Sequence, residues 1–529
     1  MQQLRMYSGF FRGAFLATLL FHFAPERTSA QPNATLAQGE SQARGLTLEN
    51  VVEAALENSY SIRRYADQVR VRESEVQMAE GAFDLYFDFL AARGQDRRLY
   101  TEAEREALNV PTSETGITTY RIGVSRRFRS GLLVSPGVEL ARHDAFTFRS
   151  APIVRTRAAL NFAYPLLRGG TRSPESVAVD AAEIAAEASE LQLHDVRTRS
   201  IYLAAAAYWA YHGAHQALRI LSESEEKSHR LLEETAALVA GDERPASDLD
   251  QLRADLADRI SARLGAEQAL FEARQQLGIE MGLAPHDAAD FSAPATAFPT
   301  SRLDLDLPDS GRLITLALAE RADLAGARRD AAAADLVLEA RRTAARPGLD
   351  LRLDVGYSGL TEGDLQLGQY FPPFGQNDVG GGSATLSLVF DFPAANNSAR
   401  GALARQEAML RQSHLTVAEL EQTITSSILV AAGQLRSSAA ELEQAEEAVH
   451  LYEMALENER KKLQLGMSTQ FELLLVDERL RNAMLSRVSA QVRFAQALAR
   501  LRYDTGTLLP DGTDFTAADQ TRRLMTPVD

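Results

Sequence analysis

The sequence predicts a mainly α-helical fold with an added β region, arranged as two copies of one structural unit. Three observations carry this prediction. The chain contains two helical stretches of unusual length, several segments in which apolar and polar residues alternate, and nearly the same spacing of turn residues, mostly glycines, in both halves.

The composition is that of a large folded protein. The chain has 529 residues, of which 45% are hydrophobic and 24% charged, and it contains no cysteine. These values exclude a disordered chain and a disulfide-stapled scaffold. The formal net charge of -16 argues against a general nucleic-acid binder, because an acidic surface repels phosphate.

Residues 1–30 have the layout of a secretory signal peptide. Arg5 and Arg12 precede or interrupt an apolar stretch, and small residues follow up to Ala30. The alternative is a buried N-terminal helix, but the polar residues that follow offer it no partner face. A cleaved signal places the mature chain outside the cytoplasm. No comparable apolar run occurs after the linker at 31–45, so we expect no membrane-spanning helix in the mature chain.

The remainder of the chain reads as a duplicated unit. The first structural repeat is expected at 46–282 and the second at 313–506, with an inter-repeat linker at 283–312 and a C-terminal tail at 507–529. The alternative is two unrelated helical hairpins of similar size. Spacing favours duplication. In the first repeat, 71 positions separate Gly170 from Gly241 and 41 separate Gly241 from Gly282. In the second repeat, 70 positions separate Asn396 from Gly466 and 40 separate Gly466 from Gly506.

Each repeat contains a helical stretch of about 70 residues, which as one helix would be about 105 Å long. Apolar residues recur at alternating three- and four-residue steps from Leu442 to Leu463, interrupted only at Glu459, as in a coiled-coil seam. The return helix of about 40 residues is too short to cover such a partner. Together with the opening helix of about 35 residues it covers about 75, so we expect two short helices stacked end to end against each long one.

The segments between the helices predict β-strands, at about 83–165 in the first repeat and about 349–392 in the second. In the stretch from Leu349 to Tyr357, for example, every second residue is apolar and the residues between them are charged or glycine. This period is that of strands whose two faces meet different media. On the pattern alone, a half-buried sheet in a soluble sandwich is the favoured interpretation, and the context of these strands reverses that preference.

Two long strands per repeat predict four strands per chain. Strands that cross a lipid bilayer must close into a barrel, and four strands cannot do so. If these strands cross a membrane, several copies must therefore combine them. The first repeat also carries extra sequence, which an added hairpin of Tyr120–Phe128 and Leu132–Leu140 would explain.

The residues also resemble the TolC-like outer-membrane efflux protein family over essentially the whole mature chain. Leu46–Asn58 is similar to the start of that family, and Ala317–Ala325 is similar to the corresponding part of its second half. Tyr208 and Trp209 resemble a common aromatic pair. The most specific match is at the second hairpin tip, where Lys462–Ser468 is followed by Phe471–Leu474.

This resemblance implies a homotrimer. In such an assembly, four strands per protomer form a 12-strand β-barrel in the outer membrane of a Gram-negative bacterium, continued by an α-helical barrel through the periplasm. It implies a passive exit duct of a tripartite efflux pump or a type I secretion system. The implied partners are outer-membrane lipid, a periplasmic adaptor (membrane fusion) protein and an inner-membrane pump, with no nucleic acid. The pump supplies the energy, so no catalytic site, cofactor or metal is expected.

The two hairpin tips, near 241–249 and 463–474, are the expected docking points for the adaptor. The first tip departs from the family pattern, with Ala237 at a usually basic position and a turn lengthened by Asp242–Pro245. The candidate docking residues are Gly241, Ser247, Leu249, Lys462, Gly466, Ser468 and Phe471.

Four acidic residues just after the tips are pore-gate candidates, because a symmetric trimer would triplicate each into a ring. They are Asp250, Asp255, Glu472 and Asp477, with Leu475 at a position where the family can place another acid. The alternative is that they are solvated acids near helix N-termini. Ser247 and Ser468 are equally well read as helix caps.

Two other classes of function remain open from the residues alone. One is a periplasmic coiled-coil adaptor or scaffold with a soluble β domain, and the other is a secreted enzyme using the β region. No nucleophile, base and orienting group have spacing typical of a hydrolase. His212 and His215 are spaced as a helical metal pair, but packed or solvated histidines explain them better.

Overall fold

The computed structural model describes residues 45–147, 151–168, 172–242, 245–300, 308–363, 379–509 and 516–528. The predicted signal peptide and nearly all of the predicted 31–45 linker lie outside these residues. The unit discussed below begins at Leu46.

Four helices in each half have nearly the same lengths and order. In the first half they are α1 (Leu48–Asn58), α2 (Tyr60–Glu80), α4 (Pro174–Ala240) and α5 (Ser247–Glu280), with 11, 21, 67 and 34 residues. In the second half they are α6 (Ser310–Glu320), α7 (Ala322–Ala344), α8 (Asn397–Gln464) and α9 (Gln470–Asp504), with 11, 23, 68 and 35 residues. Two further short helices are α3 (Glu102–Leu108) and α10 (Ala517–Leu524).

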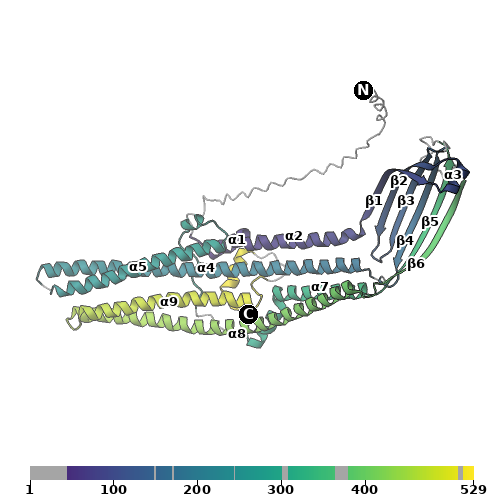
Figure 1. Ribbon diagram of the computed structural model, residues 1–529. Coiled ribbons are helices and arrows are strands. Elements are labelled where there is room, and N and C mark those ends of the chain that lie inside the picture. The colour runs from purple at the N-terminus through teal and green to yellow at the C-terminus, as the bar shows by residue number, and fades with distance from the viewer. Residues whose placement is uncertain are drawn as a thin grey trace, which may run out of the picture. The chain divides into compact units, whose positions relative to one another are not determined.

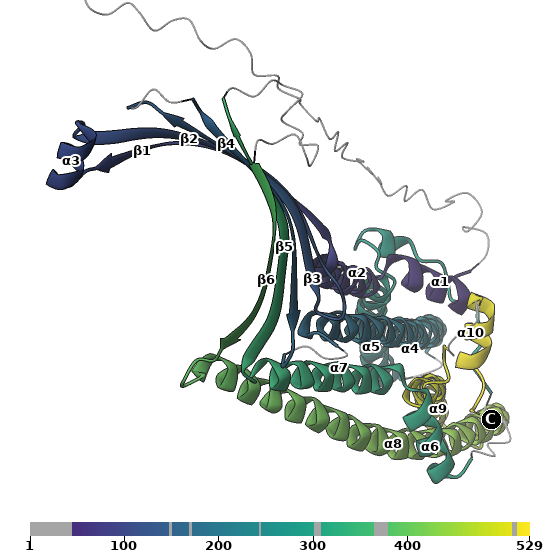
Figure 2. The same ribbon diagram turned by 90° about the vertical axis from the view of Figure 1, so that its right-hand side faces the viewer.

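The helices form a wall. The long helix α4 packs against α2 and α5, and also against α7 and α9, which in turn pack against the long helix α8. Figures 1 and 2 show α2 and α5 following one another along α4, and α7 and α9 following one another along α8. The expected stacking of two short helices against each long one is therefore present.

Small and apolar residues explain this close packing. The coiled-coil seam expected on α8 is buried at Leu442, Val449 and Leu456, which face α9 residues such as Leu480. Alanines fill the centre of the wall, where the paired positions 204–205 and 431–432 are almost fully buried. Small side chains let helix axes approach closely.

Two glycines fix the joints between stacked helices. Gly282 and Gly506 end α5 and α9 with φ of +69° and +73°. A Cβ on Gly282 would lie 2.5 Å from the backbone oxygen of Asn58, where α1 ends, and one on Gly506 would lie 3.0 Å from the backbone of Glu320, where α6 ends. Only glycine combines this conformation with so close a backbone approach.

All the strands of the described residues belong to one antiparallel sheet. It has six strands in the order β1 (Leu85–Leu99), β2 (Thr112–Arg127), β3 (Leu133–Ala145), β4 (Ile153–Pro165), β5 (Gly348–Glu362) and β6 (Val379–Asp391). Four of them come from the first half of the chain and two from the second.

The expectation of four strands per chain is therefore wrong, because the sheet of one chain has six. The counting assumed that both repeats contribute equally, whereas the sequence expected as an added hairpin joins the sheet as full-length strands. β2 and β3 are connected through Gly131, which has φ of +86°, and the Phe128 N–H donates to the Leu132 oxygen across this turn. Continuous register with β1 and β4 on either side makes the hairpin part of the sheet.

Candidate functional site

One face of the sheet is apolar across all six strands. The strand register places Phe89, Ile122, Val138 and Ala158 in one row from β1 to β4, and the neighbouring rows continue through β5 and β6. Phe89, Ile122 and Val138 are exposed, and Phe89 is 70% accessible. The exposed apolar members are Leu85, Phe87, Phe89, Tyr120, Ile122, Val138, Leu160, Val355, Leu386, Leu388 and Phe390. A soluble protein rarely exposes so continuous an apolar surface.

The opposite face of the sheet is polar and charged. On it, the Arg121 Nε donates to Glu139 at 2.9 Å between β2 and β3, and Arg157 donates to Asp354 at 2.6 Å between β4 and β5. A hollow of about 520 Å³ opens on this face near the helical end of the sheet, and Asn161 is among its lining residues. The two faces thus match two different media, one apolar and one aqueous.

The sheet is fastened to the helical wall through the β2–β3 turn. Arg127 forms an ion pair of 2.8 Å with Glu175 in the first turn of α4, and the N–H of Ser173 donates to the oxygen of Arg129. Arg129 also lies over the ring of Phe83, which precedes β1. The added hairpin is therefore tied to elements on both sides of it.

The second hairpin tip, between α8 and α9, exposes three apolar side chains. Gly466 has φ of +71°, and the next N–H, that of Met467, donates to the Lys462 oxygen at 2.9 Å, which closes the end of α8. Leu465, Met467 and Phe471 are 73%, 74% and 57% accessible. Of the predicted docking residues, Lys462 pairs with Glu459 at 3.0 Å. Leu465 and Met467 were not singled out from the sequence, although their position beside the tip glycine marks them as exposed.

The first hairpin tip, between α4 and α5, has a different turn. Gly241 ends α4 with φ of -85°, and Asp242 takes the left-handed conformation instead, with φ of 58°. Ser247 begins α5 and makes no capping hydrogen bond, because the residue at the cap position is Ala246. Leu249 is half-buried.

Two of the four gate candidates are exposed acids of helix first turns. Asp250 is 83% exposed and forms a loose pair of 3.4 Å with Arg253. Glu472 accepts from the Thr469 N–H at 3.0 Å and from the Ser468 hydroxyl at 2.9 Å, and these hydrogen bonds lower the pKa of its carboxyl. Thr469, not Ser468, caps α9. Glu472 thus serves as the third residue of a capping box.

The other two candidates meet on one buried arginine. Arg259 on α5, 2% exposed, donates to Asp255 at 2.7 Å and to Asp477 on α9 at 3.2 Å. Its guanidinium also donates to the Ser224 hydroxyl on α4 at 2.6 Å. Arg259 therefore joins the two hairpins below the tips and neutralises the two acids within one chain. In the sequence, this role is indicated by nothing more than an arginine four residues after Asp255.

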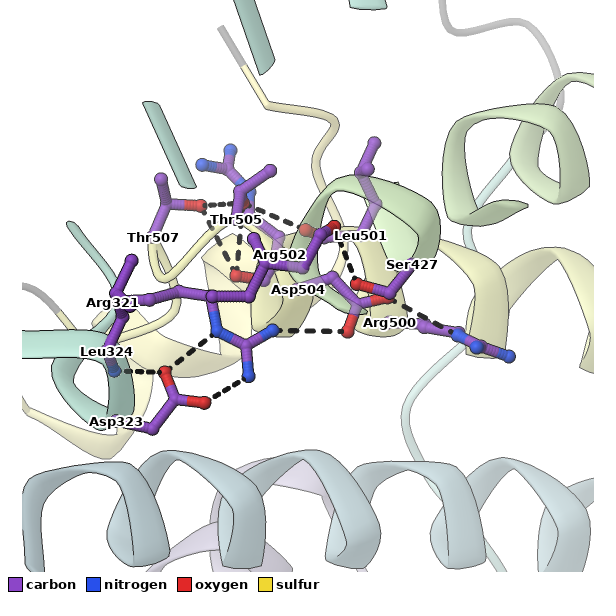
Figure 3. A network of polar contacts seen from close by, with 11 residues as sticks. Arg321, Asp323, Leu324, Ser427, Arg500, Leu501, Arg502, Asp504, Thr505 and Thr507 are labelled. Carbon is purple, nitrogen blue, oxygen red and sulfur yellow. Dashed lines mark hydrogen bonds and ion pairs between the residues drawn. The ribbon is translucent and has the colours of Figure 1, made fainter. Parts of the chain in front are cut away.

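A second polar network lies at the joint between α9 and α7 (Figure 3). Arg321, at the break between α6 and α7, donates to Asp323 at 2.6 Å and lies 3.9 Å from Asp504 near the end of α9. Arg500 also pairs with Asp504, at 3.4 Å. Burial, followed by the nearby charge of Asp323, raises the pKa of Asp195 on the adjacent α4 to about 6. This network was not anticipated from the sequence.

His212 is packed in the core. Its ring stacks on Phe298 with centroids 4.2 Å apart, and Trp209 also stacks on Phe298. Burial lowers the pKa of His212 to about 4, so the ring is neutral at physiological pH. Within the described ranges, no three His, Cys, Asp or Glu side chains are grouped so as to hold a metal ion.

No helix in the described part of the chain combines the length and the apolar character that crossing a bilayer requires. No protein-family model matches the chain, and no curated protein matches it in sequence.

Solved structures do match. The CmeC outer membrane channel of Campylobacter jejuni superimposes with a TM-score of 0.64 at 14% identity, covering 91% of this chain and 90% of CmeC. The outer membrane protein VceC of Vibrio cholerae gives 0.61 at 18%, covering 87% and 96%. The open state of the MtrE outer membrane channel of Neisseria gonorrhoeae gives 0.58 at 15%, covering 87% and 88%. The chain has the outer-membrane channel fold. This confirms, at the level of the fold, the resemblance that the sequence motifs indicated.

Arg259→Met is expected to destabilise this outer-membrane channel fold and loosen the hairpins. The substitution leaves Asp255 and Asp477 partly buried without their counter-charge, which costs about 3 kcal/mol. Thermal unfolding in detergent would measure the loss of stability, and limited proteolysis of the hairpins that contain α5 and α9 would measure their loosening. Arg253→Met is the matched control, because the exposed Arg253–Asp250 pair contributes less than about 1 kcal/mol. Equal unfolding temperatures for the two variants would contradict the role of Arg259.

Asp195→Asn is expected to change how stability depends on pH. Because the pKa of Asp195 is raised in the folded state, its contribution is favourable at low pH and is lost as pH rises through about 6. The variant should therefore gain stability relative to the native chain between pH 4.5 and 7.5, by about 1 to 2 kcal/mol. Melting curves across this range would measure it. Asp67→Asn, which alters an exposed acid on α2, is the matched control. A stability difference for Asp195→Asn that stays constant across this pH range would refute the assignment.

Proposed function

We propose that this protein is a passive channel of the outer membrane of a Gram-negative bacterium, whose helical part extends into the periplasm. In this proposal the sheet crosses the lipid, and the helical wall continues the tube on the periplasmic side. The observation that carries the proposal is the two-faced sheet, whose exposed apolar side lies opposite a charged one. Lipid on one face and water on the other is the environment that such a surface fits.

The tube is proposed to be a homotrimer. A single sheet of six strands has two open edges, and hydrocarbon offers no partners for the backbone groups there. Copies that pair edge to edge satisfy those groups. The helical wall supports the same arrangement, because its two flanks, α8 and the stacked α2 and α5, carry exposed apolar residues such as Leu429 and Phe271. The paired helix lengths support the internal duplication that the sequence predicts.

The proposed role is export, as the exit duct of a tripartite efflux pump or a type I secretion system. The hairpin tips would dock a periplasmic adaptor and, through it, an inner-membrane pump that supplies the energy. The exposed apolar residues of the second tip support docking there. The first tip, with its longer turn, offers fewer such side chains among the described residues. The cargo is left open, since nothing in the tube identifies it.

The exposed apolar face also separates this proposal from a periplasmic scaffold with a soluble β domain. A soluble sheet would have to cover that face with another layer. In the described residues no helix packs against the faces of the sheet, apart from contacts near its ends. A secreted enzyme is likewise disfavoured, because the central charged residues of the polar face form ion pairs with one another, Arg121 with Glu139 and Arg157 with Asp354.

Insertion into the membrane can be tested with two adjacent substitutions in β4. Leu160→Arg places a charge on the apolar face, where an arginine near the bilayer centre costs about 2 to 4 kcal/mol, so the outer-membrane fraction should lose most of the protein. Asn161→Arg is the matched control on the polar face and should leave the outer-membrane level unchanged. Fractionation with heat-modifiable migration on gels measures both. Normal insertion of Leu160→Arg would overturn the membrane assignment.

The proposed gate at the tips now rests on Asp250 and Glu472, because Asp255 and Asp477 are paired with Arg259. In a trimer each exposed acid forms a ring of three charges, which attracts cations. Asp250→Ala is therefore expected to reduce cation selectivity and cation block of single channels in planar bilayers. Glu472→Ala should do the same and also fray the start of α9. Currents identical to those of the native channel in both variants would reject the gate.

A further inference from the structure

We propose that three copies of this chain close an 18-strand barrel, in which β1 of one copy pairs with β6 of the next. The membrane section of the duct would then be as wide as its helical section. The inference rests on the proposed function, which supplies the number of copies. The 18-strand barrel replaces the 12-strand barrel that the family resemblance implied, and it sets the width of the channel within the membrane.

The first argument is that the added hairpin is part of the sheet. β2 pairs with β1 along the whole length of β1, and β3 pairs with both β2 and β4. The β2–β3 turn is held by the Arg127–Glu175 ion pair and by the hydrogen bond from the Ser173 N–H to Arg129. A hairpin that lay outside the barrel wall would have to break the pairing of β1 with β2 or of β3 with β4.

The second argument is that the apolar face is continuous over all six strands. β1 presents Phe87 and Phe89 on this face, and β6 presents Leu386 and Leu388 at the other edge. The added hairpin contributes Ile122 and Val138 to the same band. If the hairpin or either edge strand lay outside the lipid, these exposed side chains would meet water instead.

The third argument comes from the two edges. β1 starts just after α2 and β6 ends just before α8, so β1 runs away from the helices and β6 runs back toward them. A β1 strand placed beside β6 of a neighbouring copy is therefore antiparallel to it, as every other pair in the sheet is. When three copies are related by rotation and each makes this β1–β6 contact with the next, the strands close into a ring without a free edge.

The fourth argument is one of width. At the base of the sheet, four helices per copy connect to the strands, namely α2, α4, α7 and α8. Helices spaced about 9 to 10 Å apart span about 38 Å of circumference per copy. Strands about 4.8 Å apart and tilted by about 40° give about 38 Å for six strands but only about 25 Å for four. Six strands thus match the wall, and the barrel would measure about 36 Å between backbones in place of about 24 Å.

The native chain has no cysteine, so engineered disulfides can test the edge pairing without background. Phe89→Cys on β1 would be combined with single cysteines on the apolar face of β6, at Gly382, Ala384, Leu386 or Leu388. Oxidation of the membrane-embedded protein should convert most of the chain into covalent dimers and trimers for at least one pair. Non-reducing gels measure this.

Val138→Cys is the matched control, because Val138 lies in the same row as Phe89 but on β3. In the 18-strand barrel β3 is enclosed by β2 and β4, so Val138→Cys should not link to β6 of another copy. Links from Val138→Cys and none from Phe89→Cys would show that β1 and β2 lie outside a 12-strand barrel. Absence of links from either position would also overturn the proposed edge contact.

A second measurement uses the unmodified protein. Electron cryomicroscopy in lipid nanodiscs should show a trimer with 18 strands in the membrane. A membrane-embedded trimer with 12 strands would refute this inference and leave the proposed function intact. Recovery of no membrane-embedded oligomer at all would refute the proposed function itself.

Discussion

Hydrogen bonding of the sheet edges is the constraint on which the rest of the molecule depends. Each edge strand, β1 and β6, is 13 residues or longer and presents backbone N–H and C=O groups that no other described strand pairs. In water such edges invite aggregation, and in hydrocarbon each unpaired group costs several kcal/mol. The exposed apolar face adjoining both edges also makes a single chain unstable against association in water. In the proposed trimer, one chain is therefore one part of a larger closed surface.

In the proposed tube, the helical wall must keep an even height. The long helices α4 and α8 each run the full height, and pairs of shorter helices run beside them. Such pairs need a joint, and the chain builds two of them with a left-handed glycine that approaches the backbone at a break in the opposing helix. The second joint adds the Arg321 network with Asp323 and Asp504. Charged groups there hold the helix ends in register, where apolar packing alone would allow sliding.

The same principle of internal neutralisation shapes the tips. Arg259 forms ion pairs with Asp255 and Asp477 and so neutralises their charges. Glu472 accepts hydrogen bonds from the Thr469 N–H and the Ser468 hydroxyl in the capping box. Acidic residues that look alike in sequence therefore have different surroundings. The carboxylates of Asp250 and Glu472 remain exposed and are suited to an ion path, and a small apolar group at the second tip remains exposed and is suited to a protein contact.

By itself the sequence determined the local and periodic features of this protein. The coiled-coil seam at Leu442, Val449 and Leu456 and the alternation within each strand follow from residue patterns of period 3.5 or 2, which depend on neighbours along the chain. The tip at Gly466 follows from the spacing of turn residues and from its local motif. The resemblance in the motifs then pointed to the correct fold.

Only the tertiary structure decided the number of strands in the sheet and the environment of each tip acid. Strand pairing depends on residues far apart in the chain, such as Val355 beside Leu160, and Arg259 reaches Asp477 across more than two hundred positions. Local patterns contain no information on such partners, because the energy of an ion pair or a strand pair is set by distance in space.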